Sequence, residues 1–344
     1  MSKLNIGVVT VRSANGETGG AERFYESLVD SFQRIGHAAT EIIVEADERD
    51  FDHIQRNYLA CYDLNLQEFD CVISTKAPTW MVRHPRHVCY LVHTVRVFYD
   101  MFTTAFPQPT EELFRQQELV HSLDTGALRA PRCKAIFSIG HEVASRLRQY
   151  NSLESEVLHP PLWTDDFYEG VAADYILMPG RLHPWKRVDL VVDAMRYVDA
   201  PLQLYIVGTG EAESDLKSRA SGDGRIKFLG RIADAELKRL YSNALAVAFT
   251  PNREDYGYVT LEAYASGKPV LTCTDSGEPA ALVRNGETGY VCEPSPEAIA
   301  ECLKKMRADH LRMARMGREG KEWVRTLSWE NIARRLIAAA MGQV

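Results

Sequence analysis

Short runs of β-branched and apolar residues alternate with amphipathic helical stretches along the whole chain. This order is typical of parallel sheets with helices on both faces, because a crossover helix usually links neighbouring parallel strands. The pattern breaks at His159-Pro160-Pro161 and at the acidic Thr164-Asp165-Asp166, and it restarts with a strand-like run at 175–178. We therefore expect two doubly wound α/β units, and a length of 344 residues suits two domains of ordinary size.

Both halves of the chain supply several candidate elements. In the first half we expect helices at 21–35, 111–123 and 141–150, and strands at 4–10, 39–44, 71–75, 88–93 and 135–138. In the second half we expect strands at 175–178, 202–207, 226–229, 245–250 and 269–272. The last stretch is predicted to be a helix with Ser328 as its N-cap, because Trp329, Ile332, Leu336 and Ile337 share one apolar face.

Composition excludes some classes of function. The chain carries 40 Lys and Arg against 47 Asp and Glu, and a formal net charge of -7 disfavours a dedicated nucleic-acid binder. The 7 cysteines form no CxxC pair and have no histidine at zinc-ligand spacing, which favours a reduced compartment and no metal site. The N-terminal apolar run is too short for a signal peptide and no run is long enough to span a membrane, so we expect a cytoplasmic protein.

Two carboxylates with seven residues between them, Glu254 and Glu262, give the strongest local signal. Glu254 belongs to a loop after the expected strand at 245–250, and Glu262 lies near the start of the next helix. Gly257 allows a ligand to approach the backbone closely, and the amides of residues 258–260 would point at an anion. Together these groups could hold the two ends of a nucleotide sugar. The alternative is that Glu254 is a surface acid and that Glu262 only complements the helix dipole.

Arg181 and Lys186 follow the expected strand at 175–178, in a loop that opens a helix. Two cations in that position could stabilise a departing diphosphate without a metal. A solvated basic helix start is the alternative for either residue taken singly, and we assign Arg187 to that interpretation.

Weaker signals lie at other strand ends. Gly19-Gly20 separates the first strand from the first helix, where glycines permit close contact with phosphate. His93 ends the expected strand at 88–93 and could hydrogen-bond a sugar hydroxyl or a reacting oxygen, although most lone histidines are structural. The segment at 207–213 imitates a dinucleotide fingerprint, but Glu213 stands where its third glycine should be, which counts against a nicotinamide dehydrogenase. The basic clusters at 83–87 and 129–134 could face an anionic lipid headgroup or could be solvated loops.

Taken together, these motifs resemble the retaining GT-B glycosyltransferases of family 4 over nearly the whole chain. The resemblance is most specific at 186–190, 228–231 and 254–267, and the stretch from His93 to Asp100 is similar to a mannosyltransferase-like branch that builds surface polysaccharides. It implies two Rossmann-like domains facing across a cleft, with an acceptor-side domain at 1–163, a nucleotide-sugar domain at 164–326 and a C-terminal helix at 327–344 that packs back on the first domain.

The resemblance also assigns roles to residues. Glu262 would bind the ribose, Arg181 and Lys186 the diphosphate, and Glu254 the sugar near its anomeric carbon. His93 would contact the sugar or the acceptor. Further donor contacts would come from Gly19, Gly20, Gly230, Arg231, Gly257, Tyr258 and Val259.

The implied reaction transfers a hexose from a nucleoside diphosphate sugar to an acceptor hydroxyl, with retention of configuration and no bound metal or other cofactor. GDP-mannose is the first expectation for the donor, ahead of UDP-glucose and UDP-N-acetylglucosamine. The acceptor would be a sugar, a polyprenyl-linked glycan or another glycan, reached at the inner face of the membrane if the first domain contacts lipid. The alternatives are a GT-B nucleotide-sugar epimerase or hydrolase, and a two-lobed solute-binding protein without catalysis.

Overall fold

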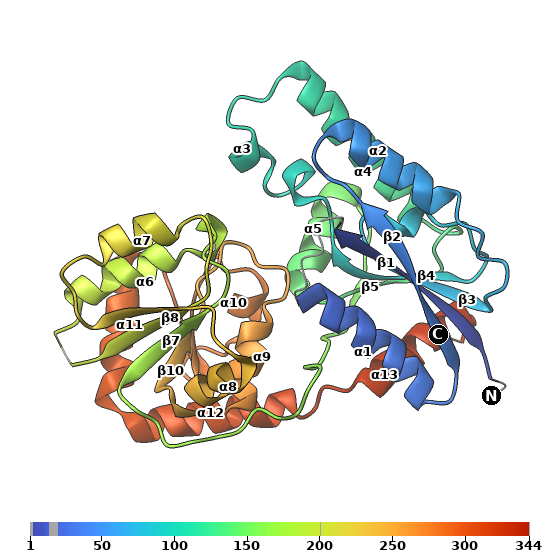
Figure 1. Ribbon diagram of the computed structural model, residues 1–344. Helices are drawn as coiled ribbons and strands as arrows, with labels where there is room; N and C mark the ends of the chain where they lie inside the picture. Colours follow the sequence, from blue (N-terminus) through green and yellow to red (C-terminus); the bar gives the residue numbers. More distant parts are fainter. Residues whose placement is uncertain (1–2, 14–19, 200, 344) are drawn as a thin grey trace. The chain divides into compact units, whose positions relative to one another are not determined.

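The computed structural model describes residues 3–13, 20–199 and 201–343. These residues divide into two compact units. The first unit contains the residues up to Trp163 together with those from Ser328 onward, and the second contains Thr164–Leu327. Each unit has its own six-stranded parallel sheet, coloured mainly blue to green in the first and green to orange in the second (Figure 1).

The sheet of the first unit has the strand order β2-β1-β3-β4-β5-β6, with every neighbouring pair parallel. Its strands are β1 (Asn5–Ser13), β2 (Ala38–Ala46), β3 (Cys71–Lys76), β4 (His87–His93), β5 (Ile136–Ser138) and β6 (Glu156–Val157). Strands β1, β3 and β4 are almost wholly buried, as parallel strands covered on both faces should be. The chain first adds a strand on one side of β1 and then continues on the other side, so the direction of winding reverses between β1 and β3.

Helices from both ends of the chain cover this first sheet. They are α1 (Gly20–Arg34), α2 (Phe51–Tyr62), α3 (Phe102–Ala105), α4 (Glu111–Leu128), α5 (His141–Asn151) and α13 (Trp329–Ala340), with short 3-10 turns η1 (Thr79–Met81) and η2 (Arg96–Phe98). Helix α13 lies beside α1 and against β3 and β4 (Figure 1). Its N-cap Ser328 accepts a hydrogen bond from the backbone N–H of Asn331, and the Trp329 indole N–H donates to the Leu162 carbonyl over 3.2 Å.

The second sheet has the order β12-β11-β10-β7-β8-β9 and is also parallel throughout. Its strands are β7 (Tyr175–Pro179), β8 (Gln203–Val207), β9 (Ile226–Gly230), β10 (Ala246–Ala248), β11 (Val270–Cys273) and β12 (Gly289–Cys292). The chain builds outward from β7 through β8 to β9, returns to β10 on the other side of β7, and then continues to β11 and β12. The direction of winding therefore reverses between β7 and β10.

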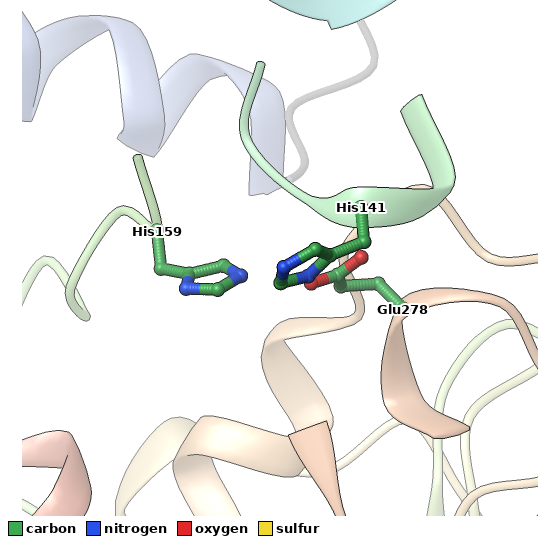
Figure 2. Close-up of side chains that lie close together, drawn as sticks. All are labelled: His141, His159 and Glu278. Carbon is green, nitrogen blue, oxygen red and sulfur yellow. The ribbon is translucent and has the colours of Figure 1, made fainter. Parts of the chain in front are cut away.

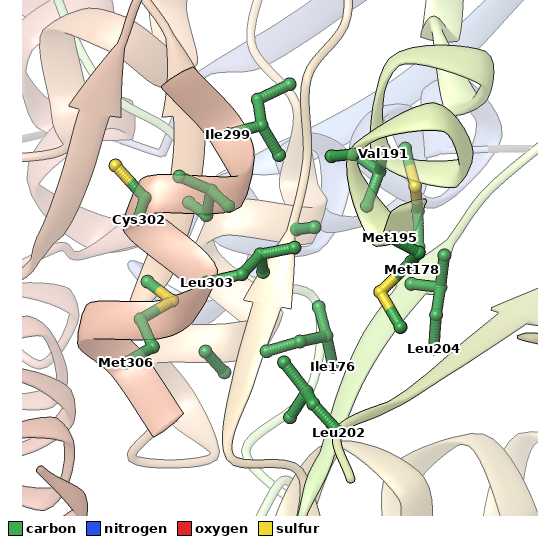
Figure 3. Close-up of a cluster of buried hydrophobic side chains, with 14 of the residues drawn as sticks. Ile176, Met178, Val191, Met195, Leu202, Leu204, Ile299, Cys302, Leu303 and Met306 are labelled. Atoms are coloured by element: carbon green, nitrogen blue, oxygen red, sulfur yellow. The ribbon is translucent and has the colours of Figure 1, made fainter. Parts of the chain in front are cut away.

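Helices cover both faces of the second sheet. They are α6 (Val188–Ala194), α7 (Glu213–Arg219), α8 (Asp234–Asn243), α9 (Tyr258–Ala265), α10 (Glu278–Leu282), α11 (Pro296–Ala308) and α12 (His310–Val324), with 3-10 turns η3 (Pro184–Lys186) and η4 (Met195–Tyr197). Figure 3 shows the core on one face, where Val191 of α6 and Leu303 of α11 pack over strand residues such as Ile176. On the other face, α8 and α9 contribute Tyr241 and Tyr264 to a second buried cluster.

The expected fold class is confirmed, because both units are parallel α/β sheets wound in two directions. The main difference is at 245–250, where only Ala246–Ala248 is a strand. Thr250 and Pro251 instead direct their carbonyls to the side chain of Arg187, so the chain leaves the sheet early. None of the helices in the described part of the chain is long and apolar enough to cross a bilayer.

Candidate active site

Most of the predicted donor-site residues lie where the winding of the second sheet reverses, between β7 and β10. We call this place the reversal point. Ligands of doubly wound folds bind outside the carboxyl ends of the strands at such a point, because the two diverging loops leave space there. The loop after β7 carries Arg181 and Lys186, and the loop after β10 carries Glu254. Since β7 and β10 are neighbours in the sheet, residues 68 positions apart in the sequence become adjacent.

A hollow lies beside the carboxyl end of β7. Arg181, Lys186 and Phe249 are among its lining residues. Arg181 is exposed to solvent, whereas Leu182 beneath it is buried and anchors the loop to the core. Gly180 lies at the edge of the hollow with φ of +140°, a left-handed conformation that side chains rarely adopt.

Lys186 and Glu254 form an ion pair, with Nζ and Oε2 2.7 Å apart. The side chains are 28% and 23% exposed, so the pair is within reach of a ligand yet partly withdrawn from water. The Lys186 ammonium also lies 5.5 Å from the centroid of the Phe249 ring. A cation and a carboxylate are thus placed side by side at the reversal point.

The backbone holds Glu254 in place through the loop that follows β11. Its N–H donates to the Ser276 carbonyl over 2.9 Å, and its carbonyl accepts from the N–H of Glu278, also over 2.9 Å. Gly277 lies opposite with φ of +74°, and a Cβ there would come within 2.5 Å of the Glu254 carbonyl oxygen. Glycine is required at 277 because the two loops run this close together.

Gly257 ends the Glu254 loop and forms the N-cap of α9, with φ of +77°. An added Cβ would meet the Phe249 ring at 2.5 Å, so the glycine lets the chain turn directly over that ring. Tyr258 and Val259 then supply the first helical amides, which carry the positive end of the helix dipole. An anion bound at these amides would lie close to Glu254, whose Cγ is 3.3 Å from the Cβ position of Gly257.

Glu262 lies one turn further along α9 and accepts a hydrogen bond of 2.5 Å from the hydroxyl of Tyr241. Tyr241 is fully buried, and burial together with the neighbouring carboxylate raises the pKa of its hydroxyl well above the usual value. The hydroxyl therefore remains a donor, and it fixes one oxygen of Glu262.

The remaining predicted residues lie elsewhere. Gly230 ends β9 with φ of +64°, its carbonyl accepts from the N–H of Gly208, and the exposed Arg231 follows it. Strand β9 is two positions from β7 in the sheet, so these residues are not grouped with Lys186 and Glu254.

Three predicted residues belong to the first unit. Gly19 lies outside the described residues, and Gly20 is the first residue of α1. His93 ends β4 beside Lys76 of β3, and its carbonyl accepts from the N–H of Ala77.

Two histidines of the first unit were not predicted. His141 begins α5 directly after β5, and His159 follows β6, with their ring centroids 5.3 Å apart (Figure 2). Both follow the carboxyl ends of neighbouring strands, which is the signal that could have identified them.

The assignment of Arg187 to a solvated helix start was wrong. Its side chain is 17% exposed and hydrogen-bonds to Asp275 and to the carbonyls of Thr250 and Pro251. Sequence spacing gave no sign of this, because Asp275 lies 88 residues further along the chain.

Comparison with known proteins identifies the second unit. Residues 170–323 match the family model for glycosyl transferases group 1. This segment is a group 1 glycosyltransferase domain. It includes every residue of the reversal point in the second sheet, from Arg181 to Glu262.

Two relatives from Corynebacterium glutamicum match part of the chain. D-inositol 3-phosphate glycosyltransferase is 33% identical over 170 residues, which are 46% of this chain and 40% of the relative. A GDP-mannose-dependent monoacylated alpha-(1-6)-phosphatidylinositol monomannoside mannosyltransferase is 34% identical over 169 residues, 45% of this chain and 44% of the relative. The matches thus span less than half the length of either relative.

Solved structures resemble the whole chain. Sucrose-phosphate synthase from Thermosynechococcus elongatus superimposes with a TM-score of 0.75 at 18% identity, over 98% of this chain and 100% of that one. HepE from Anabaena, solved in complex with UDP and glucose, gives 0.70 at 16% identity, over 99% and 100%. With its two six-stranded parallel sheets, the chain has the GT-B fold.

Proposed function

We propose that the protein is a retaining hexosyltransferase that moves a sugar from a nucleoside diphosphate to an acceptor hydroxyl. The observation that carries the proposal is the grouping of Arg181, Lys186 and Glu254 at the reversal point of a group 1 glycosyltransferase domain. The names of the two relatives from C. glutamicum, both glycosyltransferases, support it.

Different groups of the site bind the diphosphate, the ribose and the sugar of the donor. Arg181 and Lys186 bind the diphosphate, with the first amides of α9 adding the positive end of a helix dipole. Glu262, held by Tyr241, binds the ribose hydroxyls. Glu254 binds hydroxyls of the sugar and stays beside Lys186, which faces the diphosphate.

The cations act on the leaving group. As the bond between the anomeric carbon and the diphosphate oxygen breaks, negative charge accumulates on the phosphate and positive charge on the sugar ring. Lys186 and Arg181 stabilise the first, and the Glu254 carboxylate stabilises the second. The acceptor oxygen then bonds to the anomeric carbon from the same face, and its proton passes to the departing phosphate.

The first unit supplies the acceptor side, with His93 facing the sugar or the acceptor. We favour GDP-mannose as the donor, because one relative is named as GDP-mannose-dependent, whereas the UDP bound to HepE makes UDP-sugars the next choice. A lipid-linked or other glycan acceptor, met at a membrane surface, is consistent with a relative named for a phosphatidylinositol mannoside.

A donor screen tests the proposal. GDP-, UDP-, ADP- and dTDP-sugars are compared by thermal shift and then by turnover with glycan and lipid-linked acceptors. We expect one nucleotide to stabilise the protein and its sugar to be transferred with retention. Free sugar or an epimer as the sole product, with all acceptors supplied, would refute transfer.

Two variants test the residues. Lys186→Ala should lower kcat by about 100-fold or more, since electrostatic groups of this kind contribute on that scale, and Glu254→Gln should be comparably impaired while folded. Lys217→Ala is the matched control, because Lys217 is 55% exposed and its ion pair is with Glu213 on the same helix. Wild-type turnover by Lys186→Ala would exclude its role at the diphosphate.

A further inference from the structure

Arg187 has a backbone conformation that arginine rarely adopts. It lies between η3 and α6 with φ of +50° and ψ of +44°, in the left-handed region. For a residue with a Cβ this region is strained, and glycine would occupy it without that strain. An arginine here indicates that the side chain contributes something that glycine could not.

The side chain forms a fork with four hydrogen bonds. Nη1 and Nη2 donate to the two carboxylate oxygens of Asp275 over 2.7 and 2.6 Å. Nε donates to the Thr250 carbonyl over 2.9 Å, and Nη2 also donates to the Pro251 carbonyl over 2.6 Å. Arg187 therefore ties the end of β10 to the loop after β11. A planar guanidinium suits this geometry, because its donors are fixed in direction.

The fork lies where three loops meet. Asn252 donates its N–H to the Trp185 carbonyl over 2.7 Å, and the N–H of Arg253 donates to the Asp275 carbonyl over 3.0 Å. These bonds join the Lys186 loop, the Glu254 loop and the loop after β11. Arg187 follows Lys186 directly in the chain, and its contacts at Thr250 and Pro251 lie just before the Glu254 segment. The Arg187 guanidinium thus links the Lys186 loop to the other two loops.

We propose that Arg187, with Asp275 as its counter-ion, is a positioning residue that fixes Glu254 against Lys186. The inference rests on the proposed transferase function, and it assigns Arg187 no contact with the donor. Without the fork, the loop after β10 loses its hydrogen bonds to the guanidinium but keeps its backbone bonds and the bond from Thr250 Oγ1 to the Arg187 carbonyl. The carboxylate of Glu254 then samples positions away from Lys186. A displacement of about 1 Å at a reacting centre can cost about 100-fold in rate.

The main experiment compares Arg187→Gly with Arg187→Lys and Asp275→Asn. Arg187→Gly removes the fork and also relieves the left-handed strain. Any loss of activity in this variant therefore comes from the missing side chain and not from a strained backbone. We expect its kcat to fall by about 100-fold while the donor KM stays near the wild-type value, as for loss of alignment rather than of binding. Arg187→Lys should recover part of the rate, because a lysine keeps the charge but not the fork.

Asp275→Asn provides a milder change, since it keeps the acceptor oxygen and removes the charge. If Arg187→Gly fails to fold, Asp275→Asn tests whether the fork positions Glu254. We expect a smaller loss of kcat than in Arg187→Gly, again with an unchanged donor KM. The matched control is Arg196→Ala, because Arg196 is 61% exposed and lies on η4, outside the three loops. Its kcat should equal that of the wild type.

Hydrogen exchange gives a readout that does not depend on activity. The amides of Arg253 and Glu254 should exchange faster in Arg187→Gly than in the wild type, with no change in the strands. If the wild type transfers no sugar, the proposed function fails, but the exchange comparison still tests the fork. A Gly variant with wild-type kcat and wild-type exchange at these amides would overturn the inference.

Discussion

Gly257→Ala should destabilise the second unit by more than any ordinary surface glycine substitution. Gly257 has φ of +77°, and a Cβ there would lie 2.5 Å from Cε1 of Phe249 and 3.3 Å from Cγ of Glu254. Phe249 is buried, so its ring has little room to move away. The substitution combines a strained backbone with a steric clash against the ring that also underlies Lys186.

The two costs can be worked out separately. The left-handed backbone costs roughly 1 to 2 kcal/mol for a residue with a Cβ, and overpacking of a buried site typically costs about 1 to 3 kcal/mol. Together they lower the free energy of unfolding by about 3 kcal/mol. For a unit of this size, that corresponds to a fall in Tm of about 6 to 12 °C.

Two other glycines of the same unit act as controls. Gly286 has φ of +81° with no neighbour closer than 3.8 Å, so Gly286→Ala carries the backbone cost alone. Gly224 has no positive φ and nothing within 4 Å, so Gly224→Ala should be near neutral. Calorimetry of the full chain should rank the variants as Gly224→Ala, Gly286→Ala and Gly257→Ala in order of increasing loss. A Gly257→Ala protein as stable as Gly286→Ala would show that the turn relaxes freely, which would refute the reasoning.

Three further predictions concern other contacts. Tyr241→Phe should weaken nucleoside diphosphate binding by roughly 10-fold, because Glu262 loses the donor that orients it; isothermal titration that gave wild-type affinity would contradict this. Burial outweighs the hydrogen bonds that Asp124 accepts and raises the pKa of its carboxyl to about 6, so the folded state holds a proton that the unfolded chain releases near pH 4. The first unit should therefore lose about 3 kcal/mol of stability as the pH rises from about 4 to 6. Urea titrations of Asp124→Asn should lack this fall, and the same pH dependence in wild type and variant would exclude the role of Asp124. Ser328→Ala should cost about 1 kcal/mol through loss of the α13 N-cap, and an unchanged urea midpoint would show that water replaces the cap.

The sequence predicts the fold class because its signals are local. The strand at β7 ends at Pro179-Gly180, and the helix α13 begins at Ser328, each with a cap or stop that acts within a few residues. Helix α2 was missed although Asp50 caps it and Ile54, Tyr58 and Cys61 share its buried face. Strand β6 has only two residues, too few for any periodic pattern.

The candidate site was predictable only in part. Glu254 and Lys186 could be chosen because each follows a strand, but their contact depends on the pairing of β7 with β10, which no local pattern specifies. The Arg187 fork needs Asp275, 88 residues away, and the Tyr241 hydroxyl meets Glu262 across two helices. These interactions arise from the tertiary structure, so single-sequence periodicity cannot reveal them.

The return of α13 to the first unit has a consequence for synthesis. Phe24 of α1 packs against Trp329 of α13, with ring centroids 5.4 Å apart, although 305 positions of chain separate the two residues. During synthesis, the apolar face of α1 stays uncovered until α13 has left the ribosome, by which time the whole of Thr164–Leu327 is already available to fold. The first unit is thus completed only after the second has been translated, and removal of α13 should damage the first unit before it affects the second.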